Sequence, residues 1–132
     1  MDVDEIRTAF AKLSEADRKK LLRNLKRVTF NFKINKSFLK YSSHPITVPR
    51  EFYPFLAIHG ITKKEEARIT LPNGSIATAY IHYSTAGYGE YYQIRIRNFY
   101  SGLGIADLKV GDNVRVELFK DGDKTSIELV RL

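Results

Sequence analysis

Two short segments of this sequence carry side chains suited to contact a nucleic acid. The first, KSFLKYSSHP at residues 36–45, places lysines, serines and a histidine beside Tyr41. The second, HYSTAGYGEYYQ at residues 82–93, combines two glycines and four tyrosines with Glu90 and Gln93. Lysine and hydroxyl groups donate hydrogen bonds to phosphates, whereas Glu accepts from cytosine and Gln binds adenine bidentately. The pattern predicts a DNA-contacting surface; two ordinary hairpin loops with aromatic ends packed on the core are the alternative.

The segment that follows adds two arginines to this set. Residues 91–97 alternate in polarity, so Tyr92, Ile94 and Ile96 are expected to face the core. The polar residues would then share the outer face with those of a preceding hairpin strand: Gln93, Arg95 and Arg97 beside Thr78, Tyr80 and His82. Only the fork of a guanidinium group meets guanine O6 and N7 together, which favours base or phosphate contacts over a purely solvated role.

The sequence contains little that indicates catalysis or metal binding. There is no Cys, and His44, His59 and His82 lack metal-ligand spacing. The stretch Asp107-Leu-Lys109 matches the acidic-x-Lys piece of a common nuclease site, with Glu90 as a distant second carboxylate. It precedes a Gly-Asp turn and does not lie on a core strand, where a metal could be held. We therefore predict no catalytic residues, no metal and no cofactor.

The elements that must position these residues follow from hydrophobic periodicity. Asp2 with Glu5 and Ser14 with Asp17 stand at capping-box spacing, so residues 1–27 are expected to form a helical hairpin or one bent helix that packs against the rest. From Val28 the apolar period becomes two, as in half-buried strands. The expected strands are 28–34, 46–48, 67–71, 75–83, 91–97, 113–119 and 125–130, with turns at 72–74 and 121–123.

Composition and charge narrow the class of protein. A chain of 132 residues with 43% hydrophobic residues fits one compact domain. No apolar run approaches twenty residues, which favours a protein without a membrane partner, in the bacterial cytoplasm or a eukaryotic nucleus. The net charge of +7 favours a polyanionic partner. The basic excess lies in the first half of the chain, including residues 28–63, where Glu51 is the sole acidic residue.

Two stretches between residues 51 and 130 form a modest internal repeat. Glu51 to Ile81 and Asn98 to Val130 each run from a Phe-Tyr pair in a helix-like turn, through apolar residues and Gly, into a strand, a Gly-containing hairpin and another strand. Two units that each leave an apolar face uncovered can cover one another in one core. Chance similarity between two unrelated hairpins is the alternative, because hairpin composition is constrained.

Four stretches together resemble the B3-like DNA-binding pseudobarrel: VTFNFKINKS, ITVPREFYPFL, ARITLPNGSIATAYIHYS and YYQIRIRNFYSGLGIADLKVGDNVRVELF. That domain occurs in plant B3 transcription factors and in target-recognition or effector-binding domains of some Type II restriction endonucleases. The resemblance covers Val28 to Leu132. The chain lacks the Trp-containing segments of the plant proteins, which favours the restriction-associated branch.

The resemblance implies a mainly β fold, a seven-stranded open pseudobarrel with short helices, preceded by the helical hairpin as an appendage at 1–27. It also implies that two loops, an N-arm at 36–45 and a C-arm at 82–93, clasp the major groove of double-stranded DNA. The predicted DNA-binding residues are Lys33, Asn35, Lys36, Ser37, Lys40, Tyr41, Ser42, Ser43, His44, Arg50, His82, Ser84, Thr85, Tyr88, Glu90, Tyr91, Gln93, Arg95 and Arg97.

The expected function is sequence-specific DNA binding, as the recognition module of a restriction–modification or related DNA-processing system. The chain itself would not be an enzyme, and a catalytic nuclease domain or subunit is a possible partner. Two rival hypotheses stay open: a protein-interaction domain that uses the basic residues of the N-terminal helices, and a compact Mg²⁺-dependent nuclease.

Overall fold

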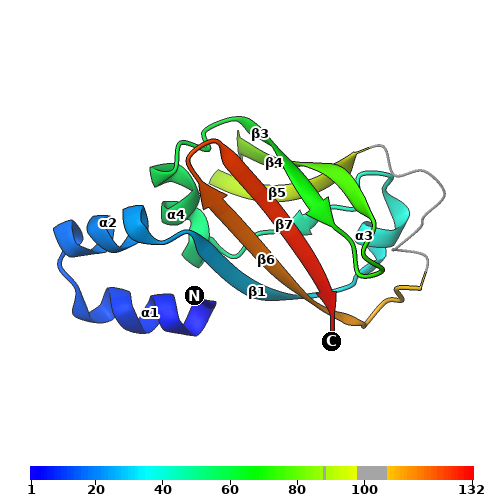
Figure 1. Ribbon diagram of the computed structural model, residues 1–132, viewed down its shortest axis with the longest axis horizontal. Coiled ribbons are helices and arrows are strands. Elements are labelled where there is room, and N and C mark those ends of the chain that lie inside the picture. Colours follow the sequence, from blue (N-terminus) through cyan, green and yellow to red (C-terminus); the bar gives the residue numbers. More distant parts are fainter. Residues whose placement is uncertain (88, 98–106) are drawn as a thin grey trace.

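A computed structural model describes residues 1–87, 89–97 and 107–132 of the chain (Figure 1). The helical elements are α1 (Val3–Lys12), α2 (Glu15–Asn24), α3 (Lys36–Lys40), the 3₁₀ turn η1 (Arg50–Phe52) and α4 (Tyr53–Ile58). The strands are β1 (Arg27–Lys33), β2 (Ile46–Thr47), β3 (Lys64–Thr70), β4 (Ile76–Ala86), β5 (Gly89–Arg97), β6 (Asn113–Asp121) and β7 (Lys124–Arg131). Every predicted strand is present, with ends shifted by three residues at most.

The strands form one sheet in the order β1-β6-β7-β3-β4-β5-β2. Neighbours are antiparallel except β3 and β7, which run parallel over Arg68–Thr70 and Ser126–Glu128. The sheet curls until it nearly closes, and one seam stays open between the edge strands β1 and β2 (Figure 1). The mainly β, open-barrel architecture expected from the sequence is thus confirmed. None of the helices in the described ranges is long and apolar enough to cross a membrane.

Strict alternation along the strands builds the interior of this barrel. In β6 the inward residues Val114, Val116 and Leu118 are fully buried, and the residues between them are partly exposed. The same period in β1 turns Val28, Phe30 and Phe32 inward. Because successive strand side chains point to opposite faces, each strand supplies one wall of a common core and one outer face open to ligands.

The N-terminal helical hairpin shares this core. Asp2 and Glu5 form the predicted capping box, and the Ser14 side chain accepts from the backbone N–H of Asp17. Helix α2 packs on α4 and α1 packs on η1, which buries Ile6 and Leu22 (Figure 1). His59 Nε2 lies 3.0 Å and 2.9 Å from the carbonyl oxygens of Leu22 and Leu25, so the end of α2 is tied to the end of α4.

The hairpins of the two units of the predicted internal repeat lie side by side in the sheet. Phe52 and Tyr53 form the helical turn of η1 and α4 that the first unit predicts. Its hairpin, β3–β4, joins the second hairpin, β6–β7, through the parallel β3·β7 pairing, and both contribute to the same buried cluster. Phe99 and Tyr100, the corresponding pair of the second unit, lie outside the described residues. Both hairpins therefore belong to one sheet and one core, and the repeat itself stays a prediction.

One charged side chain of the described residues is buried in this barrel. Lys120 continues the inward face of β6 and is 4% exposed. Its Nζ donates to Glu65 Oε1 at 2.7 Å and to Thr125 Oγ1 at 3.1 Å, and Thr125 Oγ1 donates to Glu65 Oε2 at 2.9 Å. These bonds link β3 to the β6–β7 hairpin just before the parallel pairing begins. A buried ammonium requires such partners, since unpaired burial of a charge is costly.

Candidate nucleic-acid interface

The outer face of β3, β4 and β5 collects polar side chains in two rows across the strands. The backbone register aligns Lys64 with His82 and Gln93, and Tyr80 with Arg95. Inward residues Tyr92, Ile94 and Ile96 are buried, and Arg97 is exposed. The predicted orientation of β5 and its pairing with the preceding strand are therefore confirmed.

A hollow of about 500 Å³ opens on this face beside the segment that precedes β2. It is lined by Ser42, Ser43, Lys64, Tyr80, His82, Arg95, Ile96 and Arg97. Three of these residues are cationic and none carries a carboxylate. Within the described residues, no carboxylate lies within 4.0 Å of the charged nitrogens of Lys64, Arg95 or Arg97. The hollow is consequently a site of unneutralised positive charge.

Tyr80 holds two of these cations. Lys64 Nζ lies 4.1 Å from the centroid of the Tyr80 ring, and Arg97 Cζ lies 5.5 Å from it. One terminal nitrogen of Arg97, Nη1, also donates to the Tyr80 hydroxyl at 2.6 Å. Cation–π contact and hydrogen bonding thus fix Lys64 and Arg97 on one aromatic side chain.

Arg95 is held differently, through its Nε alone. Arg95 Nε donates to Gln93 Oε1 at 2.8 Å. Burial lowers the pKa of His82 from its ordinary value of 6.5, and the positive charges of Arg95 and then Lys64 contribute smaller effects in the same direction. The two cations therefore add a positive field to the larger effect of burial, and both effects disfavour the charged form of His82.

The predicted N-arm is a short helix followed by a turn rather than a loop. Asn35 caps α3, because its Oδ1 accepts from the Phe38 backbone N–H at 2.8 Å, and Phe38 is fully buried. His44 adopts a positive φ of 43°, and its Nδ1 lies 2.7 Å from the Phe38 carbonyl oxygen. Phe38 anchors the segment, which leaves several predicted contact residues exposed: Lys36, Ser37, Lys40, Tyr41 and Ser42.

Backbone hydrogen bonds attach this N-arm to β5. The Ile96 N–H donates to the Ser43 carbonyl oxygen at 2.6 Å, and Ile46 and Thr47 pair with Ile94 and Gln93. The attachment brings Ser42 and Ser43 to the hollow next to Arg95 and Arg97. The structure thus joins the N-arm and the arginine strand, which are fifty residues apart in sequence, into one surface.

The predicted C-arm is the end of a long hairpin rather than a free loop. Strand β4 continues to Ala86 and β5 starts at Gly89, so Ser84, Thr85 and Tyr91 are paired strand residues. Tyr83 OH donates to Glu90 Oε2 at 3.0 Å, which raises the pKa of that tyrosine. Tyr88 lies outside the described residues. The sequence missed these strand ends because Ala86, Gly89 and Glu90 are of types that are depleted in strands.

The two arms lie at opposite ends of β5. The N-arm contacts the strand at Ile96, and the hairpin turn adjoins Gly89, seven residues earlier. Seven residues of antiparallel strand span roughly 23 Å. The N-arm therefore neighbours the hollow, whereas the hairpin tip lies well away from it. Two other predicted residues, Lys33 at the end of β1 and Arg50 in η1, are exposed but do not line the hollow.

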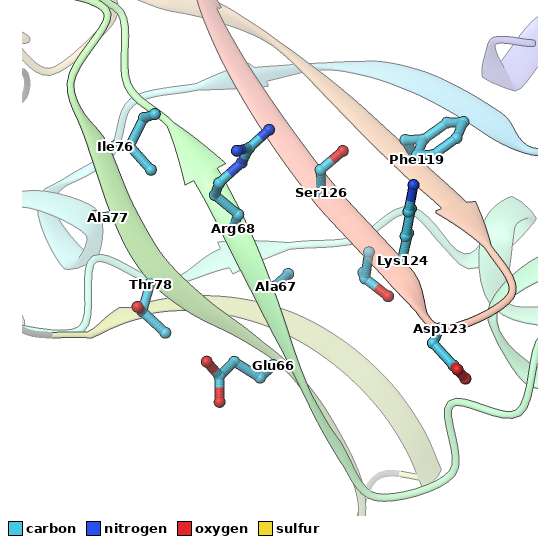
Figure 2. Close-up of a pocket in the computed structure, with 11 residues that line it drawn as sticks. Glu66, Ala67, Arg68, Ile76, Ala77, Thr78, Phe119, Asp123, Lys124 and Ser126 are labelled. Atoms are coloured by element: carbon cyan, nitrogen blue, oxygen red, sulfur yellow. The ribbon is translucent and has the colours of Figure 1, made fainter.

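A second hollow, of about 850 Å³, lies over the parallel pair β3·β7. Figure 2 shows Arg68 and Ser126 above these strands, with Phe119 on one side and Ile76 and Thr78 on the other. Glu66 and Asp123 line it together with Arg68 and Lys124, so its charges balance. This hollow consequently lacks the positive excess of the first.

Two of the polar residues that line the first hollow were not among the predicted binding residues. Lys64 begins β3 three residues before the expected start of that strand, and Tyr80 was placed on the outer face without a role in binding. Among the described residues, no group of three or more His, Cys, Asp or Glu side chains could hold a metal ion. Asp107 is exposed, and Asp112 instead caps the adjoining turn by accepting from the Lys109 N–H at 2.9 Å.

Comparisons with known proteins leave the family of this chain open. No protein-family model matches the sequence. A search of the curated proteins likewise finds no match. The function must therefore be argued from the residues themselves.

Proposed function

We propose that this protein binds double-stranded DNA with sequence preference, using the outer face of β3–β5 together with the N-arm. The observation that carries the proposal is the hollow in which Lys64, Arg95 and Arg97 converge without a carboxylate in its lining. Unpaired cations gathered on one face repel one another, so the arrangement is stabilised when an anion binds. Phosphates are the anions that a duplex offers at regular spacing.

The exposed lysines of α3 extend this surface. Lys36 and Lys40 lie on the element whose following residues, Ser42 and Ser43, line the hollow. Their side chains project from a helix that Phe38 anchors in the core, so they can reach the backbone of a duplex; Lys40 Nζ also lies 5.6 Å from the centroid of the Tyr41 ring. We assign them to sequence-independent phosphate contacts, which position the protein on DNA.

The two arginines differ in what they can recognise. Gln93 engages only the Nε of Arg95, so the two terminal nitrogens of Arg95 point away from that bond as an end-on fork. Such a fork fits guanine O6 and N7. Arg97 instead commits Nη1 to Tyr80. We therefore propose Arg95 as the principal base-reading residue.

Glu90 is the candidate for a second base contact at the hairpin end. Its Oε2 accepts from Tyr83, while Oε1 has no hydrogen bond within the described part of the chain. A carboxylate held in this way can accept from the cytosine amino group. The separation of roughly 23 Å between the hairpin end and the N-arm is about two thirds of a helical turn of DNA, so both can contact one duplex.

The B3-like resemblance supplies the biological setting of the proposal. It implies a target-recognition module of a restriction–modification or related DNA-processing system, with cleavage performed by a separate nuclease domain or subunit. The confirmed open-barrel topology is consistent with this setting. In that role the chain binds DNA and performs no chemistry itself.

The salt dependence of duplex binding tests the proposal. The logarithm of the affinity should fall linearly with the logarithm of the salt concentration, with a slope of about −0.9 for each phosphate contact. Lys36→Ala/Lys40→Ala should lower the slope by about two. Lys19→Ala/Lys20→Ala removes the same charge from α2 and should leave the slope unchanged.

Two results of this titration would oppose the proposal. An affinity that is absent or insensitive to salt would exclude DNA binding by this face. A loss of slope in the α2 variant alone would move the contact to the N-terminal helices.

A further inference from the structure

The hollow contains a more specific arrangement than a general excess of positive charge. Lys64 comes from β3 and Arg97 from β5, yet both contact the ring of Tyr80 on the strand between them. A surface lysine is ordinarily mobile, with substantial rotamer entropy. Here one aromatic side chain holds two cations close together before any ligand is bound.

The donors that remain point to the class of ligand. Tyr80 takes one N–H of Arg97 and leaves the other donors of the guanidinium available, while all three N–H groups of Lys64 lack an oxygen acceptor within the described residues. The serine hydroxyls of residues 42 and 43 line the same hollow. A tetrahedral anion with several acceptor oxygens satisfies donors that converge from different elements, and guanidinium and ammonium groups are the usual partners of phosphate.

The carboxylate of Glu66, on the neighbouring strand β3, does not line the first hollow. Glu66 aligns with Tyr80 in the register of β3 and β4, but it lines the second hollow, near Thr78 of β4 (Figure 2). Within the described residues it forms no ion pair with Lys64, Arg95 or Arg97. The first hollow therefore keeps its positive charge although a carboxylate lies on an adjacent strand.

We propose that Lys64 and Arg97, held on Tyr80, form a phosphate clamp that Ser42 and Ser43 complete. The clamp rests on the proposed DNA binding for one point only, that the phosphate belongs to a duplex backbone. Free inorganic phosphate presents the same chemistry. The two arginines of β5 then have different roles, because Arg97 binds a phosphate and Arg95 contacts a base.

The first experiment measures the clamp without DNA. Inorganic phosphate is titrated into the protein at constant ionic strength, and NMR follows the Arg97 Nε–H resonance and the titration of His82. Phosphate in the clamp should shift the Arg97 resonance and raise the pKa of His82, because the anion offsets the positive field there. Lys64→Met should weaken this binding several-fold, whereas the matched variant Lys124→Met should not.

The role of the Tyr80 hydroxyl is tested with a conservative variant. Tyr80→Phe keeps the ring but removes the acceptor for Arg97 Nη1, so phosphate should bind more weakly than to wild type and more tightly than to Lys64→Met. An effect of Tyr80→Phe larger than that of Lys64→Met would contradict the clamp, because the ring contact with Lys64 is retained.

The second experiment identifies the source of the phosphate. Duplexes that carry one neutral methylphosphonate at each successive position are compared for wild type and Lys64→Met. At one position the neutral linkage should reduce wild-type affinity and have no further effect on the variant. Lys64→Met should weaken binding to the unmodified duplex about eightfold at about 0.1 M salt. The affinity contains the salt concentration raised to about −0.9 for each phosphate contact, and 0.1 raised to −0.9 is about 8.

The two experiments separate the clamp from the wider proposal. Phosphate binding that Lys64→Met weakens, without any affinity for duplexes, supports the clamp with a small phosphate ligand and excludes DNA binding. Duplex binding that Lys64→Met and Arg97→Met leave unchanged, with no phosphate-induced shift, overturns the clamp and leaves DNA binding intact. A Lys64-dependent position in the methylphosphonate series supports both.

Discussion

Replacing Lys120 with methionine should destabilise the barrel and loosen the strand that carries Lys64. Lys120 is 4% exposed and bonds to Glu65 and Thr125 at 2.7 Å and 3.1 Å. Lys120→Met keeps most of the side-chain volume but leaves the Glu65 carboxylate without its cation. Glu65 is the residue next to Lys64 at the start of β3, where the parallel pairing with β7 has not yet begun.

The magnitude follows from the exposure of the two partners. Breaking a fully buried ion pair by removal of one partner costs about 3–5 kcal/mol. The Glu65 side chain is 28% exposed, so water can partly solvate the orphaned carboxylate. We therefore expect a loss of about 2–3 kcal/mol in the free energy of unfolding, below the fully buried case.

Urea denaturation followed by circular dichroism measures this loss, with exposed Lys124→Met as the matched control. The double variant Lys120→Met/Glu65→Gln should recover part of the stability, because the second change removes the uncompensated charge. A Lys120→Met protein within about 0.5 kcal/mol of wild type would refute the assignment of this pair as a structural link, since that is the range of ordinary surface substitutions.

Three further predictions concern a pH effect, a buried hydroxyl and catalysis. The pKa of His82 is lowered in the folded state, so the unfolded chain binds a proton at this residue more readily. The free energy of unfolding should therefore be unaffected by His82 above pH 6.5 and should fall as the pH drops from 6.5 toward the folded pKa. His82→Gln should remove this fall from a pH series of unfolding curves. Tyr92→Phe should cost about 1–2 kcal/mol in urea denaturation, because the Tyr92 hydroxyl donates to the Ile61 carbonyl oxygen and its loss leaves that buried acceptor unpaired; an unchanged midpoint would contradict this bond. Incubation of the purified chain with Mg²⁺ and duplex DNA should leave the DNA uncut in a gel assay, whereas cleavage that Asp107→Ala abolishes would show that the chain is a nuclease.

The sequence predicts the strands well because one face of this sheet is apolar and buried and the other is polar and more exposed. Alternation in β5 places Arg95 and Arg97 outside, and the register with Tyr80 follows once β4 and β5 form a hairpin. A shift of one residue would bury both arginines, which fixes the register strongly. Local patterns of this kind are read directly from neighbouring residues.

The parts of the site that were missed depend on contacts between distant segments. Nothing near Lys64 in the sequence shows that β3 begins there, because KKEE reads as a solvated charged run. Helix α3 has only five residues, too few for a periodic signal, and its stability comes from the Asn35 cap and the burial of Phe38. The distance between the two arms likewise depends on which end of β5 each one meets.

Selection of binding sites from a randomised duplex tests the central claim most directly. Wild type should enrich a defined sequence, and Arg95→Ala should cost about 1–3 kcal/mol on that sequence and relax preference at one or two positions, one of them a guanine. Lys40→Ala should weaken all sequences about equally and keep the same profile, and Glu90→Ala should relax a different position. If wild type enriches no sequence, or if all three variants keep the wild-type profile and affinity, sequence recognition by this face of the barrel is contradicted.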